Sequence, residues 1–326
     1  MRNITSAIVV LALIANISYA QGLIQTFGNG ANQFAIEFVE IGNPGNTSYE
    51  QRSGWFPQYV GQVNEVYNMG KYEISRDMIE KANASGGLGI TLQDMTVYGG
   101  GGPNKPASGI NWFEATRFVN YLNVSQGYSP AYKYDSSGNY LRWAPSDVGF
   151  NNLNPLRNSN AHYFLPNTDE FVKAGYYDPN KNGIGQGGYW IYSTQLEYRD
   201  PTAISSGTDS GSEVYSQAAE TGPSDIFYAG GLSAYGTMAQ DGNIWEWTET
   251  VDPRGDIMSD PGRNIRGGAW QFPSQYEVGL YRSGYYFATD ENPTFGFRVA
   301  SVPEPSALSL IAVGLGGWAM MRRRRS

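Results

Sequence analysis

Residues 242–247 read Gly242-Asn243-Ile244-Trp245-Glu246-Trp247. Two further motifs also place glycine beside a large aromatic ring, namely Arg266-Gly267-Gly268-Ala269-Trp270 and Gly296-Phe297-Arg298. Glycine lets the backbone approach closely or take positive φ, while an adjacent indole brings a large area to bury. The segment 235–298 therefore predicts a specific, irregular core around which the rest of the chain folds.

The composition favours a loop-rich globular protein. The chain has 326 residues, of which 40% are hydrophobic, and this is enough to bury a sizeable core. It contains 41 Gly and 24 Tyr, and only 16% of its residues are charged, so long helices are disfavoured. The net charge is -8, whereas phosphate binding needs clustered Lys and Arg. Nucleic acid is therefore not expected as a partner.

The cysteine and histidine counts limit metal chemistry. The chain has no cysteine, which excludes disulfides, thiolate nucleophiles and thiolate metal sites. It has one histidine, His162, so a single chain cannot assemble a histidine-rich zinc, copper or iron centre. No copper cofactor is expected.

The N-terminus has the pattern of a secretory signal peptide. Met1-Arg2-Asn3 precedes an apolar run over residues 7–17, and small residues follow up to Ala20. This order of a basic start, a short apolar run and small residues predicts a signal peptide over residues 1–20, cut by signal peptidase after Ala20. The chain is therefore expected to be exported.

The C-terminal tail, residues 302–326, contains three features in a fixed order. Pro303-Glu304-Pro305 comes first, then an apolar segment over residues 306–321, and then four arginines. Arginines beyond an apolar span stay cytoplasmic, so the tail predicts a short transmembrane segment that tethers the chain to the inner membrane before processing. Together these features resemble the PEP-CTERM sorting signal of Gram-negative bacteria. The resemblance implies cleavage by an exosortase and a location in the cell envelope or extracellular matrix.

Three short helices are predicted between the two ends. Ser75 is placed to cap a helix that runs to about Asn83. Two further helices begin at capping boxes, which pair Asn111 with Glu114 and Asn167 with Glu170. Gly175 is predicted to close the last of these helices.

Strands are predicted at residues 34–41 and 63–73, where apolar residues recur with turn residues nearby. Ser136-Ser137-Gly138-Asn139 predicts the turn of a hairpin. Residues 178–229 are polar and rich in glycine, as is typical of surface loops on a rigid scaffold. No linker divides the middle of the chain, so one domain is expected over residues 34–301.

Six ordered motifs resemble those of the formylglycine-generating enzyme family, also known as sulfatase-modifying factors. They are Gly70-Lys71-Tyr72-Glu73-Ile74-Ser75, Pro106-Ala107-Ser108-Gly109-Ile110-Asn111-Trp112, Leu165-Pro166-Asn167, and the three glycine and aromatic motifs that end at Trp247, Trp270 and Arg298. The resemblance implies an α+β fold, the family's variant of the C-type lectin fold, with short helices on twisted antiparallel sheets and abundant loops.

The same resemblance implies an oxidase whose chemistry this chain is expected to lack. The family's oxidases convert a substrate cysteine to formylglycine with copper held by two cysteines shortly after the Arg-Gly-Gly motif. Phe272 and Glu277 stand nearest those positions here. Phenylalanine cannot ligate copper, and one carboxylate cannot replace two thiolates for a soft metal. Related iron-dependent sulfoxide synthases need several histidines, which are also absent.

The resemblance further implies a calcium site. Its ligands would be the backbone carbonyls of Gly242 and Ile244 and the carboxylate of Glu246, and oxygen ligands of this kind suit calcium. An upstream ligand position of the family is Ala239 here, so the site depends on whether neighbouring Asp241 compensates. The alternative is that Glu246 pairs with a nearby residue and binds no metal.

Three functions remain open from the sequence. The first is a non-catalytic pseudoenzyme domain that binds a glycan or matrix ligand. Ligand contacts are expected from Trp270, Tyr276, Arg282 and Tyr285, because exposed aromatic rings beside this strand can stack on sugars. The second is an enzyme with cysteine-free chemistry that uses carboxylates such as Asp241, Glu246 or Glu277. The third is a structural matrix protein.

Overall fold

The fold is known from a computed structural model, which describes residues 22–53, 56–99, 101–253, 262–273 and 279–303. The predicted signal peptide and the apolar segment of the tail therefore lie outside the described residues. Within the described ranges, no helix is both long enough and apolar enough to cross a membrane.

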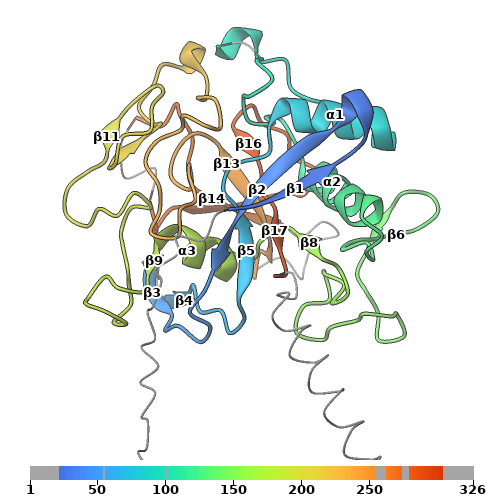
Figure 1. The fold of residues 1–326 in the computed structure, drawn as a ribbon, viewed down its shortest axis with the longest axis horizontal. Helices are drawn as coiled ribbons and strands as arrows, with labels where there is room; N and C mark the ends of the chain where they lie inside the picture. The colour runs from blue at the N-terminus through green and yellow to red at the C-terminus, as the bar shows by residue number, and fades with distance from the viewer. Residues whose placement is uncertain (1–21, 54–55, 100, 254–261, 274–278, 304–326) are drawn as a thin grey trace, which may run out of the picture.

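A five-stranded antiparallel sheet brings the two ends of the domain together (Figure 1). Its order is β1 (Leu23–Phe27), β2 (Phe34–Ile41), β5 (Tyr67–Gly70), β17 (Ala300–Ser301) and β8 (Tyr163–Phe164). The β2 bounds match the predicted strand. The second predicted strand is wrong in length, because only Tyr67–Gly70 of residues 63–73 is paired. The sheet also extends beyond the predicted start of the domain, since β1 pairs with β2.

A four-stranded sheet carries the motifs that the sequence placed at the centre of the fold. Its order is β15 (Ser283–Tyr286), β14 (Arg263–Arg266), β13 (Trp245–Val251) and β16 (Phe295–Gly296). The β13 and β16 strands run parallel, whereas the other neighbours are antiparallel. Because β16 leads through Phe297 and Arg298 into β17, the two sheets are joined along the chain.

Four pairs of short strands lie outside the two main sheets. They are β3 (Tyr49–Ser53) with β4 (Phe56–Val60), β6 (Lys133–Tyr134) with β7 (Tyr140–Leu141), β9 (Tyr177–Asp178) with β10 (Gly188–Tyr189), and β11 (Thr202–Ala203) with β12 (Ser212–Glu213). The β6–β7 hairpin turns where Ser136-Ser137-Gly138-Asn139 predicted it. Long loops with little regular structure dominate residues 178–229, as expected.

Three short α-helices begin where the capping residues predicted. They are α1 (Arg76–Gly86), α2 (Trp112–Ser125) and α3 (Thr168–Tyr176). Both predicted capping boxes form, and the Ser75 side chain accepts from the backbone N–H of Met78. Gly175 lies inside α3 rather than closing it, because the helix continues to Tyr176. Short 3-10 turns cover Gly30–Asn32, Thr96–Tyr98 and Ala219–Thr221.

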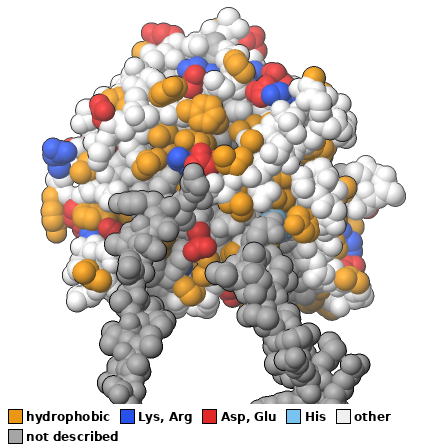
Figure 2. Space-filling view, viewed as in Figure 1, with side chains coloured by type: hydrophobic (Ala, Val, Ile, Leu, Met, Phe, Trp, Pro, Cys, Tyr) orange, Lys and Arg blue, Asp and Glu red, His pale blue; other side chains and the backbone are white. Residues whose placement is uncertain are grey.

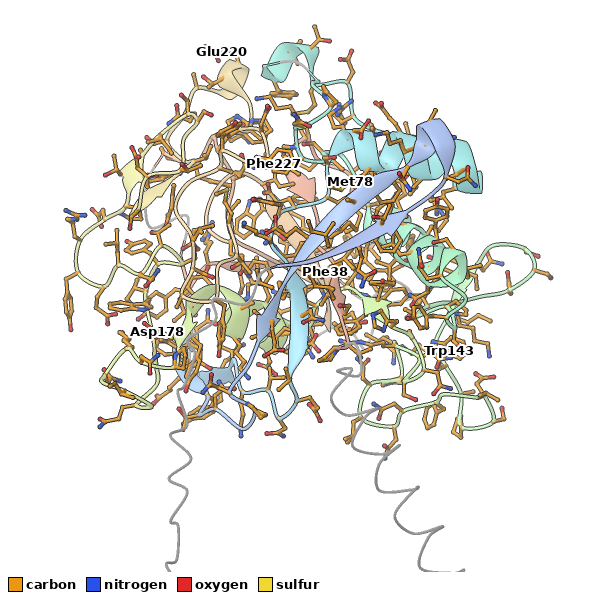
Figure 3. All side chains as sticks on the ribbon, viewed as in Figure 1. Phe38, Met78, Trp143, Asp178, Glu220 and Phe227 are labelled. Carbon is orange, nitrogen blue, oxygen red and sulfur yellow. The ribbon has the colours of Figure 1, made fainter. Side chains whose placement is uncertain are left out.

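The core lies between the sheets and α2. Trp112 and Trp247 are fully buried, and each indole N–H donates to a backbone carbonyl, at 3.0 Å to Thr248 and 2.7 Å to Ile110. These contacts confirm that the two tryptophans serve packing. Figure 3 shows Phe38 where the central strands cross, surrounded by packed side chains. Figure 2 shows scattered charged side chains on this face and no block of Lys and Arg.

Candidate functional site

The glycine and aromatic motifs meet at one end of the four-stranded sheet. In its register Glu246, near the start of β13, lies opposite Arg266, the last residue of β14. Arg266 in turn lies opposite Ser283, the first residue of β15. The segments that precede β13, follow β14 and precede β15 therefore lie together in space.

Asn243 connects these segments to the rest of the domain. It has a left-handed φ of 59° and its carbonyl accepts from the N–H of Trp270 at 3.0 Å. Its backbone N–H donates to Val214, its side-chain oxygen accepts from the N–H of Ser224, and its side-chain nitrogen donates to Glu73 at 2.6 Å. Asparagine tolerates this backbone conformation and also supplies both hydrogen-bonding functions. One residue thus fixes four distant segments.

Glu246 forms a buried ion pair with Arg298. The guanidinium donates from Nε and Nη2 to the two carboxylate oxygens, each at 2.6 Å. Arg298 also donates to the carbonyls of Gly70 and Met238. Burial raises the pKa of Glu246, and the neighbouring Arg298 opposes that rise. The carboxylate is consequently neutralised by a side chain of its own domain.

Glu73 is a second buried carboxyl group beside this pair. Its exposed fraction is 1%, and one carboxyl oxygen accepts from the Asn243 side chain. Burial, followed by the nearby charge of Glu246, raises the pKa of Glu73 well above its ordinary value. Two carboxylates that share one arginine cannot both stay ionised at low cost, so the arrangement favours a protonated Glu73 beside an ionised Glu246.

Asp241 belongs to a separate buried cluster. Its carboxylate accepts from the hydroxyl of Tyr176 and from the backbone N–H groups of Ser193 and Gly279. Burial raises the pKa of Asp241 to about 6, and these hydrogen bonds act in the opposite direction. Neighbouring Glu213 is also buried, and burial together with the charge of Asp241 raises its pKa well above the ordinary value. The two side chains are poised to share a proton.

An aromatic contact occupies the region just after the Arg-Gly-Gly motif. The Phe272 ring meets the buried Trp245 edge-on, with ring centroids 5.6 Å apart. The Arg282 guanidinium lies 5.7 Å from the Trp245 ring centroid, within range of a cation–π interaction. We call the surface formed by Phe272 and Arg282 beside Trp245 the motif surface. Tyr285 lies opposite Asn264 in the sheet register, on the same face as Arg266, whereas Trp245 and Trp247 belong to the other face.

Comparison with known families identifies the domain. Residues 33–302 match the Sulfatase-modifying factor enzyme 1-like domain, which covers most of the chain. The chain belongs to this family. Residues 301–325 match the PEP-CTERM protein-sorting motif. The sulfatase-modifying-factor domain is thus part of an exported exosortase substrate of the Gram-negative envelope, sorted through a membrane-anchored stage.

Solved structures confirm the fold of this sulfatase-modifying-factor domain. A Treponema denticola variable protein 1 structure shares 17% identity, with a TM-score of 0.58 over 86% of this chain and 99% of that chain. CarF shares 15% identity, with a TM-score of 0.52 over 82% and 99%. PvdO from Pseudomonas aeruginosa shares 12% identity, with a TM-score of 0.52 over 86% and 98%. No curated protein matches the sequence. The predicted α+β variant of the C-type lectin fold is confirmed.

The ligand-binding residues predicted from the sequence fall in different environments. Trp270 is fully buried, its indole N–H donates to the Ala219 carbonyl at 3.2 Å, and the expectation of an exposed Trp270 ring is therefore wrong. Arg282 is half-buried on the motif surface, and Tyr285 is half-buried on the other face of the sheet. Tyr276 and Glu277 lie outside the described residues. A stacking role for Tyr285 and Arg282 stays a prediction.

The predicted calcium ligands do not fit a metal site in this arrangement of the sulfatase-modifying-factor domain. Arg298 already takes both oxygens of Glu246, and Asp241 directs its carboxylate to Ser193 and Gly279 instead. Within the described ranges, no three His, Cys, Asp or Glu side chains gather as a metal site. Calcium at the Gly242 and Ile244 carbonyls would require the buried arginine to move, so we expect no calcium to bind there in this arrangement.

Three functional features were missed from the sequence. The central role of Asn243, the buried Glu73 and the Asp241–Glu213 pair all depend on contacts between distant segments. Glu73 and Asn243 each lie within one of the six family motifs, and this marked them as candidates. Their distance in the sequence does not indicate that they contact each other. Glu213 lies in the short strand β12 within the loop-rich segment 178–229, where the sequence gave no signal for it.

Proposed function

We propose that this exported domain is non-catalytic and binds a saccharide of the cell envelope or extracellular matrix at the motif surface. The observation that supports it most is the packing of Phe272 against Trp245. The family resemblance implies that oxidases hold copper with a cysteine near this position, and this chain has no cysteine at all. A packed aromatic ring there offers surface for binding but no ligand for copper.

Three properties of the motif surface support a saccharide as the ligand. Phe272 and Arg282 are half-buried, so part of each side chain faces solvent. Nearby, Tyr286 and Phe287 are 43% and 45% exposed on the edge strand β15 and its following turn. Aromatic faces stack on the C–H faces of sugars, and the Arg282 guanidinium can donate to sugar hydroxyls.

The proposal is tested by two assays on the full chain purified in detergent. A glycan array reports binding, and a cysteine-bearing sulfatase peptide with added copper reports oxidase turnover. We expect binding that weakens in Arg282→Ala and Phe272→Leu, with no formylglycine formed. Absence of binding to any glycan contradicts the ligand proposal, and formation of formylglycine contradicts the non-catalytic proposal.

A further inference from the structure

A polar pocket lies apart from the motif surface and shares no residue with it. The pocket encloses about 600 Å³ and opens to solvent between the β4–β5 loop, the loop over residues 151–161 and the first turn of α3. Both loops lie at the lower edge of the molecule in Figure 1. A volume of this size is within the usual range for small-molecule sites and accommodates one or two sugar rings.

The pocket wall is rich in side-chain amides and carboxylates. These groups come from Gln62, Asn64, Glu65, Asn151, Asn154, Asn158, Asn167, Asp169 and Glu170. Amide groups both donate and accept, and carboxylates accept, so together they match the donors and acceptors of sugar hydroxyls. A pocket lined by so many polar side chains is complementary to a ligand that carries many hydroxyl groups.

Several of these polar groups have hydrogen-bonding capacity to spare. The Asn167 oxygen caps α3 and one Asp169 oxygen accepts from the N–H of Gly61 at 2.8 Å. Among the described residues, the side-chain nitrogens of Asn167 and Asn151 and the second Asp169 oxygen make no hydrogen bond. Because the end of the helix holds these donors and acceptors in place, a ligand can hydrogen-bond to them without the entropy cost of ordering the side chains.

The back wall of the pocket is rigid and holds a fully engaged arginine. Arg157 donates to both oxygens of Glu249 and of Glu170, at 2.7–3.1 Å. Its guanidinium carbon lies 3.7 Å from the Phe164 ring centroid. Because two carboxylates already neutralise this arginine, it adds little net positive charge for an anionic ligand. With Glu65 and Asp169 also in the wall, negative charge exceeds positive charge there.

The pocket rim carries two exposed aliphatic side chains. Leu153 is 89% exposed and Val302 is 40% exposed, and both line the pocket. Aliphatic groups at the rim of a polar pocket can pack on the C–H face of a sugar ring. Val302 also directly precedes the Pro303-Glu304-Pro305 tripeptide of the sorting motif. A ligand in the pocket would therefore contact the chain where the sorting motif begins.

We infer that this polar pocket is a second saccharide site, which takes a neutral sugar of one or two rings and excludes uronic-acid and sulfated glycans. The excess of carboxylates disfavours polyanions, while the amides and the free Asp169 oxygen bind hydroxyl groups. The site is independent of the motif surface, so the two ligand sites can be tested separately.

The test is calorimetric titration of the full chain in detergent with cellobiose, chitobiose and mannobiose, and with an alginate oligomer as the anionic probe. Asp169→Asn keeps the acceptor for Gly61 but replaces the free oxygen by an N–H donor. Leu153→Ala removes a rim contact and is matched by Ile184→Ala, which changes a side chain that is 98% exposed and does not line the pocket. Melting temperatures check that each variant folds.

We expect at least one neutral disaccharide to bind and the alginate oligomer not to bind at the pocket. Asp169→Asn should weaken the neutral ligand about tenfold, equivalent to roughly 1.4 kcal/mol, because it removes a hydrogen bond to a charged group. Leu153→Ala should weaken it about threefold, which corresponds to roughly one buried methylene, and Ile184→Ala should not weaken it. Hydrogen exchange should slow in residues 62–67 and 151–161.

Two results overturn this inference. One is that no neutral disaccharide binds, and the other is that its affinity and exchange protection do not respond to Asp169→Asn and Leu153→Ala. Arg282→Ala separates the two sites. Binding lost in Arg282→Ala but kept in Asp169→Asn supports the motif surface and contradicts the pocket, and the reverse pattern supports the pocket and contradicts the motif surface.

Discussion

Both carboxylate oxygens of Glu246 lie 2.6 Å from guanidinium nitrogens of Arg298, and both side chains are fully buried. Glu246 belongs to β13 of the four-stranded sheet. Arg298 lies between β16 and β17 and also donates to the Gly70 carbonyl at the end of β5. The ion pair therefore connects the two main sheets at the point where the family's motifs converge.

Arg298→Leu is expected to destabilise the domain strongly. The variant leaves Glu246 as an unpaired buried charge, and breaking such a pair costs about 3–5 kcal/mol. Urea unfolding measures the change in free energy. Lys81→Leu is the control, because the Lys81–Asp77 pair is partly exposed on α1 and exposed pairs contribute about 0–1 kcal/mol. Equal effects of the two variants would contradict the structural role of the buried pair.

Calcium is expected to leave the thermal midpoint unchanged. Arg298 already supplies the positive charge opposite Glu246, so a calcium ion has no free carboxylate to bind there. The measurement compares melting curves in calcium chloride and in EGTA. A midpoint that rises with calcium in the wild type but not in Glu246→Gln would show that the ion replaces the arginine.

Glu213→Gln is expected to stabilise the domain at neutral pH. The folded-state pKa of Asp241 is raised to about 6, so between about pH 4 and 6 the folded state binds more protons than the unfolded state. The free energy of unfolding contributed by this carboxyl group therefore falls as pH rises through that window. Burial and the charge of Asp241 favour a protonated Glu213 in the folded state, and keeping a glutamate protonated costs free energy at pH 7. A glutamine amide is neutral without this cost, which should add about 1–3 kcal/mol at pH 7 and flatten the fall.

Unfolding curves from pH 4 to pH 7 test this effect. Glu220→Gln is the matched control, because it neutralises an exposed glutamate and should leave the pH profile unchanged. A lower stability of Glu213→Gln at pH 7, or a profile identical to that of the wild type, would show that Glu213 and Asp241 do not compete for a proton.

Asn243→Ala is expected to cost about 2–4 kcal/mol, because it removes two buried side-chain hydrogen bonds. Alanine also tolerates the left-handed backbone conformation of residue 243 less well than asparagine does. Asn243→Gly loses the same hydrogen bonds without that strain and should be the more stable variant. Equilibrium unfolding measures the stability of both variants. If Asn243→Gly were less stable than Asn243→Ala, the proposed role of the backbone conformation would be wrong.

Local features of the fold could be predicted from the sequence. A capping box depends on residues three positions apart, so the starts of α2 and α3 followed directly from Asn111 and Asn167. Strand β2 alternates buried and less buried residues from Phe34 to Val39, and this pattern together with the turn residues after Ile41 predicted its bounds. Local patterns do not determine how these elements are arranged. The arrangement was predicted from the order of the six motifs, which resembles that of a known family.

The site depended on contacts between distant segments. Trp270 was predicted to expose its ring to a sugar ligand. Instead its ring is buried, and its indole N–H donates to the carbonyl of Ala219, 51 residues earlier in the chain. Asn243 and Glu73 are 170 residues apart, so no local period relates them. The sequence could show which residues replace the copper cysteines, but not that Phe272 packs on Trp245.

The most direct test of the central claim is the affinity of the motif surface for a saccharide. The ligand with the strongest glycan-array signal is titrated into the full chain in detergent, and into Arg282→Ala and Phe272→Leu. Our account predicts about a tenfold loss of affinity in each variant, equivalent to roughly 1.4 kcal/mol, with unchanged melting temperatures. An affinity that is the same in the wild type and in both variants would contradict saccharide binding at the motif surface.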